Sequence, residues 1–171
     1  MENECLKIAF SDPINPSSVK NFIGVLDKLC VEHPDAKFLT INISSPGGDV
    51  DVAIELFHFL RELDCKIQTV NTSYVNSAAV IVYLAGDIRI CHTASTFYIH
   101  SISKRLKGNY NAQKLLKEWK EITVNTDIVA TLLGQRTVKG KQYWKTLMTK
   151  GCILEAKQAV KVGLASAIMD R

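Results

Sequence analysis

The sequence predicts an α/β fold of one layered domain, with a single long helix that projects from it. Short apolar runs alternate with amphipathic segments along the chain, which is typical of strands alternating with helices. A length of 171 residues is enough for one domain with a substantial core. Because no repeat, low-complexity tract or linker interrupts this pattern, we expect a single domain over residues 1–171.

The first half of the chain is expected to alternate strands with helices. The run CLKIAF forms a short strand, and Ser17 or Ser18 can cap the helix that follows. That helix ends near Glu32, because His33 precedes a proline. The turn SSPGGD then joins a second strand to a strongly amphipathic helix. The expected ranges are strands at 5–10, 38–43 and 66–71, and a second helix at 50–64.

The second half is expected to carry a short buried helix, two strands and a helix-rich end. The helix at 111–133 is long for a domain of this size, and its broad apolar face suits either another subunit or the chain's own sheet. Gly134 and Gly163 favour helix ends. The expected ranges are helices at 77–85, 111–133, 138–149 and 156–162, and strands at 88–91, 96–100 and 165–169.

The composition is that of an ordinary soluble globular protein, with 47% hydrophobic and 22% charged residues and a net charge of +4. Its lysine-rich clusters are expected to be solvated faces, because no RNA-binding motif or aromatic platform accompanies them. The N-terminal residues do not resemble a signal peptide, and no apolar run approaches the ~20 residues of a membrane helix. We therefore expect a cytoplasmic protein with no nucleic-acid and no membrane partner.

Cysteines and histidines give no sign of a metal or cofactor site. The five cysteines are irregularly spaced without a CxxC pair, which favours reduced thiols. The four histidines show no ligand spacing among themselves or with a cysteine. We expect no metal and no cofactor.

The turn ISSPGGDV permits two interpretations. Gly47 suits the positive φ of a type II turn, Gly48 lets the backbone approach another segment, and Asp49 can cap the next helix. These residues make either a well-formed strand–turn–helix joint or, through bare glycine N–H groups, part of an anion or oxyanion site.

Ser77 follows a strand and a loop and begins a helix. Ser77 or the preceding Asn76 can simply cap this helix. The unpaired N–H groups of the first turn would also stabilise an oxyanion, so Ser77 is a candidate nucleophile as well. A nucleophilic serine needs a base. His100 ends the strand STFYIH and is the candidate base, because residues at strand ends lie at the rim of a sheet.

The glycine turn, the serine-headed helix and the strand-ending histidine, in this order, resemble the proteolytic subunit of the Clp protease family, a branch of the ClpP/crotonase fold. The likeness covers about residues 38–168. It implies that Ser77 is the nucleophile, that His100 is the general base, and that Gly47 and the backbone of Ala78 form the oxyanion hole. The matching segments are Ser45–Gly48, Ser77–Gly86, Tyr98–His100 and Glu155–Ile168.

The chain also departs from the family's pattern. Gly151 stands at the position of the family's catalytic acid, so the third member of the triad is unassigned, and Glu155 suits the cap of the last helix. Ser73 stands where the family usually has glycine. The N-terminal segment is short for the axial loops by which the family's rings meet an ATPase, so an unfoldase partner finds no support.

Three functions remain open from the sequence. The first is a serine peptidase of the Clp-like class, a homo-oligomeric ring that cleaves short or unfolded peptides. The second is a catalytically weak or inactive structural or regulatory subunit of such a ring, which the absent acid favours. The third is a crotonase-like acyl-CoA enzyme, which the presence of Ser77 and His100 disfavours.

Overall fold

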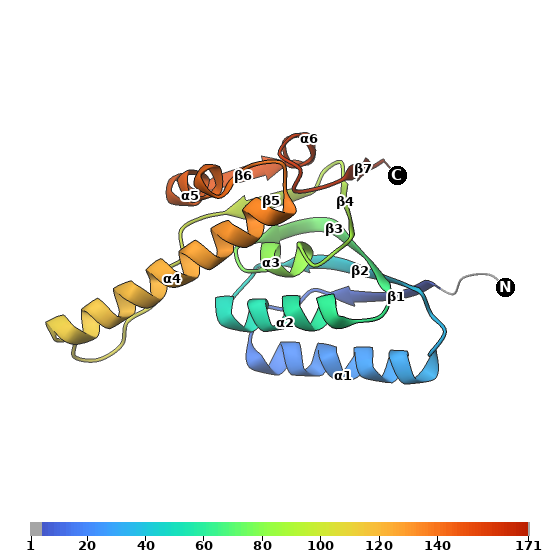
Figure 1. Cartoon of the computed structure of the whole chain (residues 1–171), viewed down its shortest axis with the longest axis horizontal. Coiled ribbons are helices and arrows are strands. Elements are labelled where there is room, and N and C mark those ends of the chain that lie inside the picture. The colour runs from blue at the N-terminus through green and yellow to red at the C-terminus, as the bar shows by residue number, and fades with distance from the viewer. Residues whose placement is uncertain (1–4, 171) are drawn as a thin grey trace.

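The computed structural model describes residues 5–170 and has the α/β fold that the sequence predicts (Figure 1). Within these residues, seven strands form a sheet in which β1, β2, β3, β4 and β7 are parallel neighbours in that order. β5 pairs with the far end of β3, and β6 pairs antiparallel with β5. The strands are β1 (Cys5–Phe10), β2 (Phe38–Ser45), β3 (Lys66–Asn76), β4 (Ile88–His92), β5 (Thr96–Ile99), β6 (Cys152–Glu155) and β7 (Ala167–Met169). The helices are α1 (Pro16–Glu32), α2 (Val50–Glu62), α3 (Ala79–Tyr83), α4 (Ala112–Arg136), α5 (Lys141–Lys150) and α6 (Ala156–Lys161).

The core lies between the sheet and the helices that cover it. α1 and α2 lie side by side along one side of the sheet, and α3 lies next to α2 (Figure 1). The apolar stripes of the two long helices face the strands, because their buried residues recur at helical spacing. These stripes are Val19, Phe22 and Leu26 in α1, and Ala53, Leu56, Phe57 and Leu60 in α2. The sheet is therefore a rigid support for the loops at its strand ends.

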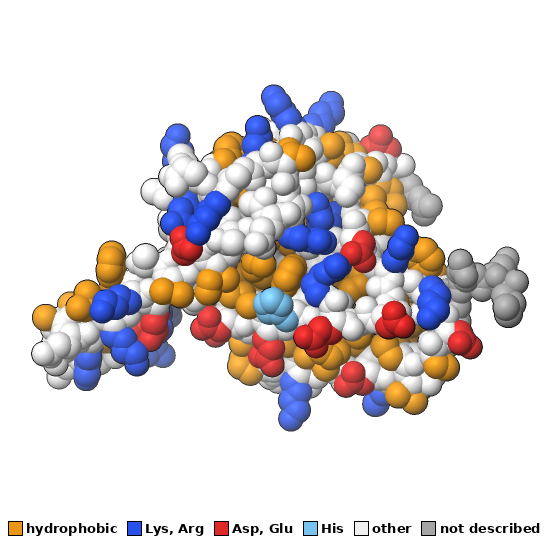
Figure 2. Space-filling model, in the orientation of Figure 1, with side chains coloured by type: hydrophobic (Ala, Val, Ile, Leu, Met, Phe, Trp, Pro, Cys, Tyr) orange, Lys and Arg blue, Asp and Glu red, His pale blue; other side chains and the backbone are white. Residues whose placement is uncertain are grey.

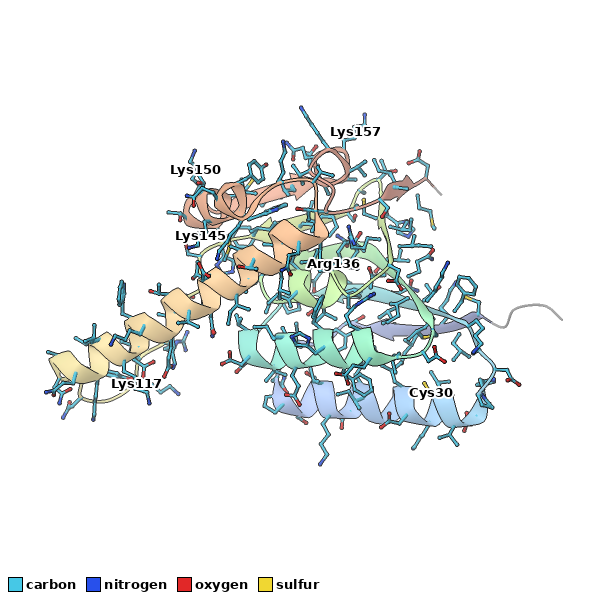
Figure 3. The ribbon with its side chains drawn as sticks, viewed as in Figure 1. Cys30, Lys117, Arg136, Lys145, Lys150 and Lys157 are labelled. Atoms are coloured by element: carbon cyan, nitrogen blue, oxygen red, sulfur yellow. The ribbon has the colours of Figure 1, made fainter. Side chains whose placement is uncertain are left out.

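α4 extends well beyond the body of the protein (Figure 1). Its last turns are anchored by the buried side chains of Val129, Ala130 and Leu133. Figure 3 shows Lys117 on the projecting part and Arg136 at the end of α4 within the body. No helix among residues 5–170, α4 included, is long and apolar enough to cross a membrane. Exposed apolar side chains line the projecting part (Figure 2), namely Leu115, Leu116, Trp119, Val124 and Ile128.

The structure corrects several element boundaries. β3 continues to Asn76, five residues beyond the predicted end, because its second half pairs with β5 after its first half has paired with β4. β6 was not expected, since a four-residue edge strand carries little periodic signal. Asn15, rather than Ser17 or Ser18, is the N-cap of α1, and its side chain accepts from both serine N–H groups.

α4 continues past Gly134 to Arg136 instead of ending at the glycine. A Cβ at Gly134 would lie 2.9 Å from the backbone nitrogen of Lys141. This glycine therefore allows the end of α4 to approach the start of α5, and it does not terminate the helix.

A partly buried arginine, Arg89, joins the C-terminal segments to β4. The guanidinium of Arg89 donates to the carbonyls of Leu164, Gly163, Gly86 and Arg136 at 2.7–3.2 Å. Carbonyls at helix ends have no partner within the helix, so these bonds satisfy groups that would otherwise be unpaired.

Candidate active site

The glycine turn after β2 lies directly against Ser77. Gly47 has φ +85°, and a Cβ at this residue would lie 2.8 Å from the Cβ of Ser77 and 2.9 Å from the nitrogen of Ala78. No side chain fits there, which explains glycine at this position. The N–H of Gly47 donates to the hydroxyl of Ser45 at 3.2 Å. The Gly47 N–H is thus already paired, although it was expected to line an oxyanion hole.

Gly48 presents its N–H on the opposite side of the same turn. The backbone runs parallel to Ile14: Ile14 N–H donates to the Gly47 carbonyl at 2.8 Å, and Asp49 N–H donates to the Ile14 carbonyl at 2.9 Å. In such a bridge, the N–H of the central residue points away from its neighbour. Within residues 5–170, the Gly48 N–H has no hydrogen-bond acceptor. Gly48 therefore offers the free donor of this turn.

Ser77 occupies the tight turn between β3 and α3. It has φ +54°, and it is the only non-glycine residue with positive φ among residues 5–170. Its N–H donates to the carbonyl of Tyr98 at 2.7 Å, which ties the turn to β5. The N-cap position of α3 belongs to Ala78, and no side chain caps this helix. The capping interpretation of Ser77 and Asn76 is therefore not what the structure shows.

His100 directly follows the last residue of β5. Its Nδ1 lies 2.7 Å from the carbonyl oxygen of Ser101. A carbonyl can only accept a hydrogen bond, so Nδ1 carries the proton and Nε2 is the basic nitrogen of the neutral ring. The imidazole also stacks on the ring of Tyr98, with 4.9 Å between ring centroids and an interplanar angle of 23°.

Ser77, Ala78, Gly48 and His100 line one pocket of about 110 Å³. Like Gly48, Ala78 has an N–H without an acceptor within residues 5–170. The residues that carry the hydroxyl, the imidazole and the two unpaired N–H groups thus line one small cavity. Among the described residues, no group of three or more His, Cys, Asp or Glu side chains is arranged to hold a metal ion. The apolar wall consists of Val50, Val80, Ile81, Ile99, Ile102, Val129, Leu133 and Met148.

The cleft continues from this pocket along the segment that follows His100. A second hollow of about 160 Å³ shares Gly48 and Ser103 with the first and reaches Asn125 on α4. Lys104 on this segment is held by ion pairs with Glu118 and Glu121 of α4. The hydrogen bonds to these carboxylates raise the pKa of Lys104 above its ordinary value. The segment after His100 is therefore attached to α4, and the two hollows adjoin along it.

A model of the family described as Clp protease matches residues 3–171 of the chain. The chain belongs to the Clp protease family. It is 27% identical over 158 residues to the ATP-dependent Clp protease proteolytic subunit 2 of Treponema pallidum. This alignment covers 86% of this chain and 72% of that protein. It is 29% identical over 135 residues to the protein of the same description from Treponema denticola, covering 77% of this chain and 66% of the relative.

The fold of this Clp protease chain is also found in a solved structure. The structure of a ClpP1 mutant from Listeria monocytogenes superposes with a TM-score of 0.83. The two sequences are 19% identical, and the superposition covers 96% of this chain and 91% of the other. The likeness confirms the fold expected from the sequence.

Position 151 of this Clp protease chain lies just beyond the paired part of β5 and β6. Ile99 and Cys152 are the last pair of this antiparallel ladder, so His100 and Gly151 are the residues that follow the pair on the two sides. Gly151 ends α5 with φ +68°, and a Cβ there would have only Tyr98 Oη within 4 Å, at 3.7 Å. Within residues 5–170, no carboxylate is hydrogen-bonded to His100; the carbonyl of Ser101 takes that place.

Two residues of the site were not predicted in these roles. Gly48 was expected only to permit a close backbone approach, and its free N–H depends on the bridge to Ile14, which lies 34 residues earlier in the chain. Tyr98 was expected only to belong to the strand segment that leads to His100. The alternation of side chains along β5 could have indicated it, because Tyr98 and His100 are two residues apart and share a face.

Proposed function

We propose that this chain is a serine-type endopeptidase of the Clp protease family that cleaves short or unfolded peptides. Ser77 is the nucleophile and His100 is the general base in this proposal. The observation that carries it is the one pocket lined by Ser77, His100 and the two residues with unpaired N–H groups, Gly48 and Ala78. The membership in a protease family supports the reaction class.

The tautomer of His100 suits the role of a base. With its proton on Nδ1 and bonded to the Ser101 carbonyl, the neutral ring can accept the hydroxyl proton of Ser77 at Nε2. The oxygen of Ser77 then attacks the scissile carbonyl carbon and forms a tetrahedral intermediate. When this intermediate collapses, the imidazolium returns the proton to the leaving amine.

The developing oxyanion needs preorganised donors close to Ser77. We assign this role to the N–H of Ala78, as the family resemblance implies, together with the N–H of Gly48. The Gly47 N–H is the weaker candidate, because it already donates to Ser45. In this arrangement Gly47 allows the turn to approach Ser77, and Gly48 supplies the donor.

The walls of the pocket indicate which side chains the site accepts. Aliphatic residues line it, and His100 is its one ionisable side chain among the described residues. Burying a charged side chain there without a partner would be costly. We therefore infer a preference for apolar residues at the cleaved position, with the rest of the peptide lying in the cleft along residues 101–104.

We also propose that the chain works as a homo-oligomer, in the ring form that the family suggests. The projecting part of α4 exposes Trp119 to 60% and four further apolar side chains. Exposed apolar faces of this extent mark association surfaces. Within residues 5–170, no other segment covers this face of α4.

A catalytically weak subunit remains the second candidate function. The specific observation that favours it is Gly151, because the removal of a triad member lowers rates by about 10⁴. The crotonase-like alternative finds no support in the family match.

Hydrolysis of fluorogenic peptides and of small activated esters tests the proposal. Wild type should hydrolyse both, and esters more readily than peptides, because an ester leaving group needs less help from an acid. Ser77→Ala should lose both activities. Ser73→Ala, which changes an exposed serine four residues earlier on β3, should retain them. An inactive wild type would favour the weak or inactive subunit, and an active Ser77→Ala would contradict the assignment of the nucleophile.

A further inference from the structure

We propose that Tyr98 is a positioning residue for the general base, which holds the ring of His100 and stabilises its protonated form through the aromatic face. This inference rests on the proposed function of Ser77 and His100. Tyr98 would supply part of the stabilisation that, within residues 5–170, no carboxylate hydrogen-bonded to His100 provides.

The contact between the two rings is direct. Their centroids are 4.9 Å apart, and their planes differ by 23°, so the rings are stacked. The contact follows from strand geometry, because Phe97 and Ile99 point into the core while Tyr98 and His100 share the outer face of β5. The tyrosine ring thus covers one face of the imidazole.

The electrostatics of this stack favour the imidazolium. The face of an aromatic ring carries negative potential, and it attracts a cation within about 6 Å of its centroid. At a partly exposed site, such a contact favours the charged form about two- to five-fold. Tyr98 is 39% exposed, so this estimate for exposed sites applies, and not the larger value for a fully desolvated contact.

Within residues 5–170, no acidic or basic side chain is hydrogen-bonded to the ring of His100. The imidazole donates to the neutral carbonyl of Ser101. Lys104, on the same segment, is occupied by carboxylates of α4. The elements around His100 carry several titratable groups, namely Cys152 and Glu155 on β6, Lys150 at the end of α5, Asp49 and Asp51 at the start of α2, and Glu118 and Glu121 on α4.

The magnitude shows how far this compensation goes. A carboxylate in the triad contributes about 10⁴ in rate, whereas the stack is expected to contribute less than ten-fold. Tyr98 therefore recovers a small part of the missing stabilisation. We therefore expect an activity that is measurable but lower than that of a complete triad.

The side chain of Tyr98 can be changed without moving the nucleophile. Ser77 is tied to the backbone carbonyl of Tyr98, not to its ring. Moreover, Tyr98 is at the surface of β5, while the core residues Phe97 and Ile99 hold the strand in place. Side-chain variants of Tyr98 therefore report on the aromatic ring.

The test compares Tyr98→Phe, which keeps the ring, with Tyr98→Leu, which removes it. The pH dependence of kcat/KM for ester hydrolysis should be unchanged in Tyr98→Phe. In Tyr98→Leu the imidazolium loses its partner, so the plateau should fall about two- to five-fold and the acid limb should move about 0.3–0.7 pH units lower. A plateau that falls while the limb stays in place would mean a merely structural role, and would overturn the inference.

A second readout does not depend on activity. The ring protons of His100, followed by NMR against pH, should titrate at a lower midpoint in Tyr98→Leu than in wild type and Tyr98→Phe. Equal midpoints in all three proteins would overturn the inference about Tyr98. A shifted midpoint in a protein that hydrolyses no substrate would support this inference and contradict only the proposed peptidase function.

Discussion

The backbone N–H of Ser77 donates a 2.7 Å hydrogen bond to the carbonyl of Tyr98, two residues before His100. This bond holds Ser77 at φ +54°, a left-handed conformation that costs a non-glycine residue about 1–2 kcal/mol. The strand that ends at the proposed base thus also fixes the proposed nucleophile. Because the bond uses backbone atoms only, Ser77→Ala should leave the fold of the site unchanged.

Placing a carboxylate at position 151 should increase peptide hydrolysis. Gly151→Asp puts a carboxylate directly after the last β5–β6 pair, on the side of the ladder where His100 follows β5. From there it would stabilise the imidazolium formed as Ser77 loses its proton. Space is available, since the nearest atom to a Cβ there is Tyr98 Oη at 3.7 Å. We expect peptide hydrolysis to rise by about ten-fold or more, toward the ~10⁴ of a complete triad.

The matched control is Gly151→Asn, which has the same size without the charge. Both substitutions carry a strain cost of order 1 kcal/mol at φ +68°, so thermal unfolding must be measured beside the kinetics. A folded Gly151→Asp that is no more active than Gly151→Asn would mean that another residue already serves His100.

Replacing Trp119 by glutamate should disrupt self-association. The side chain is 60% exposed on the projecting part of α4, and a charge there would be buried in any interface that covers this face. Light scattering at micromolar concentration should give a mass well above 19.0 kDa for wild type and a clearly smaller mass for Trp119→Glu. Val31→Glu is the control, because Val31 is 80% exposed on α1, away from α4. A monomeric wild type would contradict the proposed ring.

Adding a methyl group at Gly48 should destabilise the turn. A Cβ there would lie 2.1 Å from the carbonyl oxygen of Ile14, so the backbone bridge would have to shift. We expect Gly48→Ala to lower the free energy of unfolding by about 1–3 kcal/mol. Gly24→Ala in α1, where a Cβ meets nothing within 4 Å, should instead raise it by about 0.5–1 kcal/mol. Urea unfolding of both variants checks the prediction, and equal effects would contradict the close approach at Gly48.

The carboxylate of Asp87 should make stability depend on acid pH. Burial opposes its ionisation, but hydrogen bonds from Arg61 and from the Ile67 N–H, with the charges of Arg61 and Arg136, lower the pKa of Asp87 below its ordinary value of 3.8. A lowered carboxyl pKa stabilises the folded state above the unfolded pKa, and this stabilisation is lost as pH falls through the folded pKa.

Asp87→Asn should therefore lower the free energy of unfolding by about 1 kcal/mol or less at pH 7, since the Arg61–Asp87 pair is partly exposed. The difference from wild type should shrink as the pH is lowered below about 3.8. Asp35→Asn, at an exposed loop carboxylate, is the control and should show little difference at either pH. If the difference in the free energy of unfolding between Asp87→Asn and wild type does not change with pH, the ionised carboxylate is not what stabilises the fold.

The fold could be predicted because its signals are local. The alternation of apolar runs with amphipathic segments identified most of the strands and helices, and the helix predicted at 50–64 has the amphipathic pattern expected of it. β6 was missed because four residues of an edge strand carry almost no periodic pattern. The predicted end of α4 came too early because, in the sequence, a glycine that permits close packing, such as Gly134, cannot be told from one that ends a helix.

The candidate site could be predicted in its parts but not in its contacts. The sequence indicated Ser77 and His100 through their places at element ends, and the structure shows that both line one pocket. The sequence could not show that the Ser45 hydroxyl accepts a hydrogen bond from the Gly47 N–H, or that Tyr98 stacks on His100. Both contacts depend on side-chain orientation.

Labelling with a fluorophosphonate probe tests the central claim most directly. Such a probe reacts with a serine only when a base and an oxyanion site activate it, so its stoichiometry reports the assembled site and not merely the presence of a hydroxyl. We predict one label per chain in wild type, mapped by mass spectrometry to Ser77, with strong reduction in His100→Ala and none in Ser77→Ala. A label that persists in Ser77→Ala, or that maps to Ser73, would contradict Ser77 as the nucleophile of this chain.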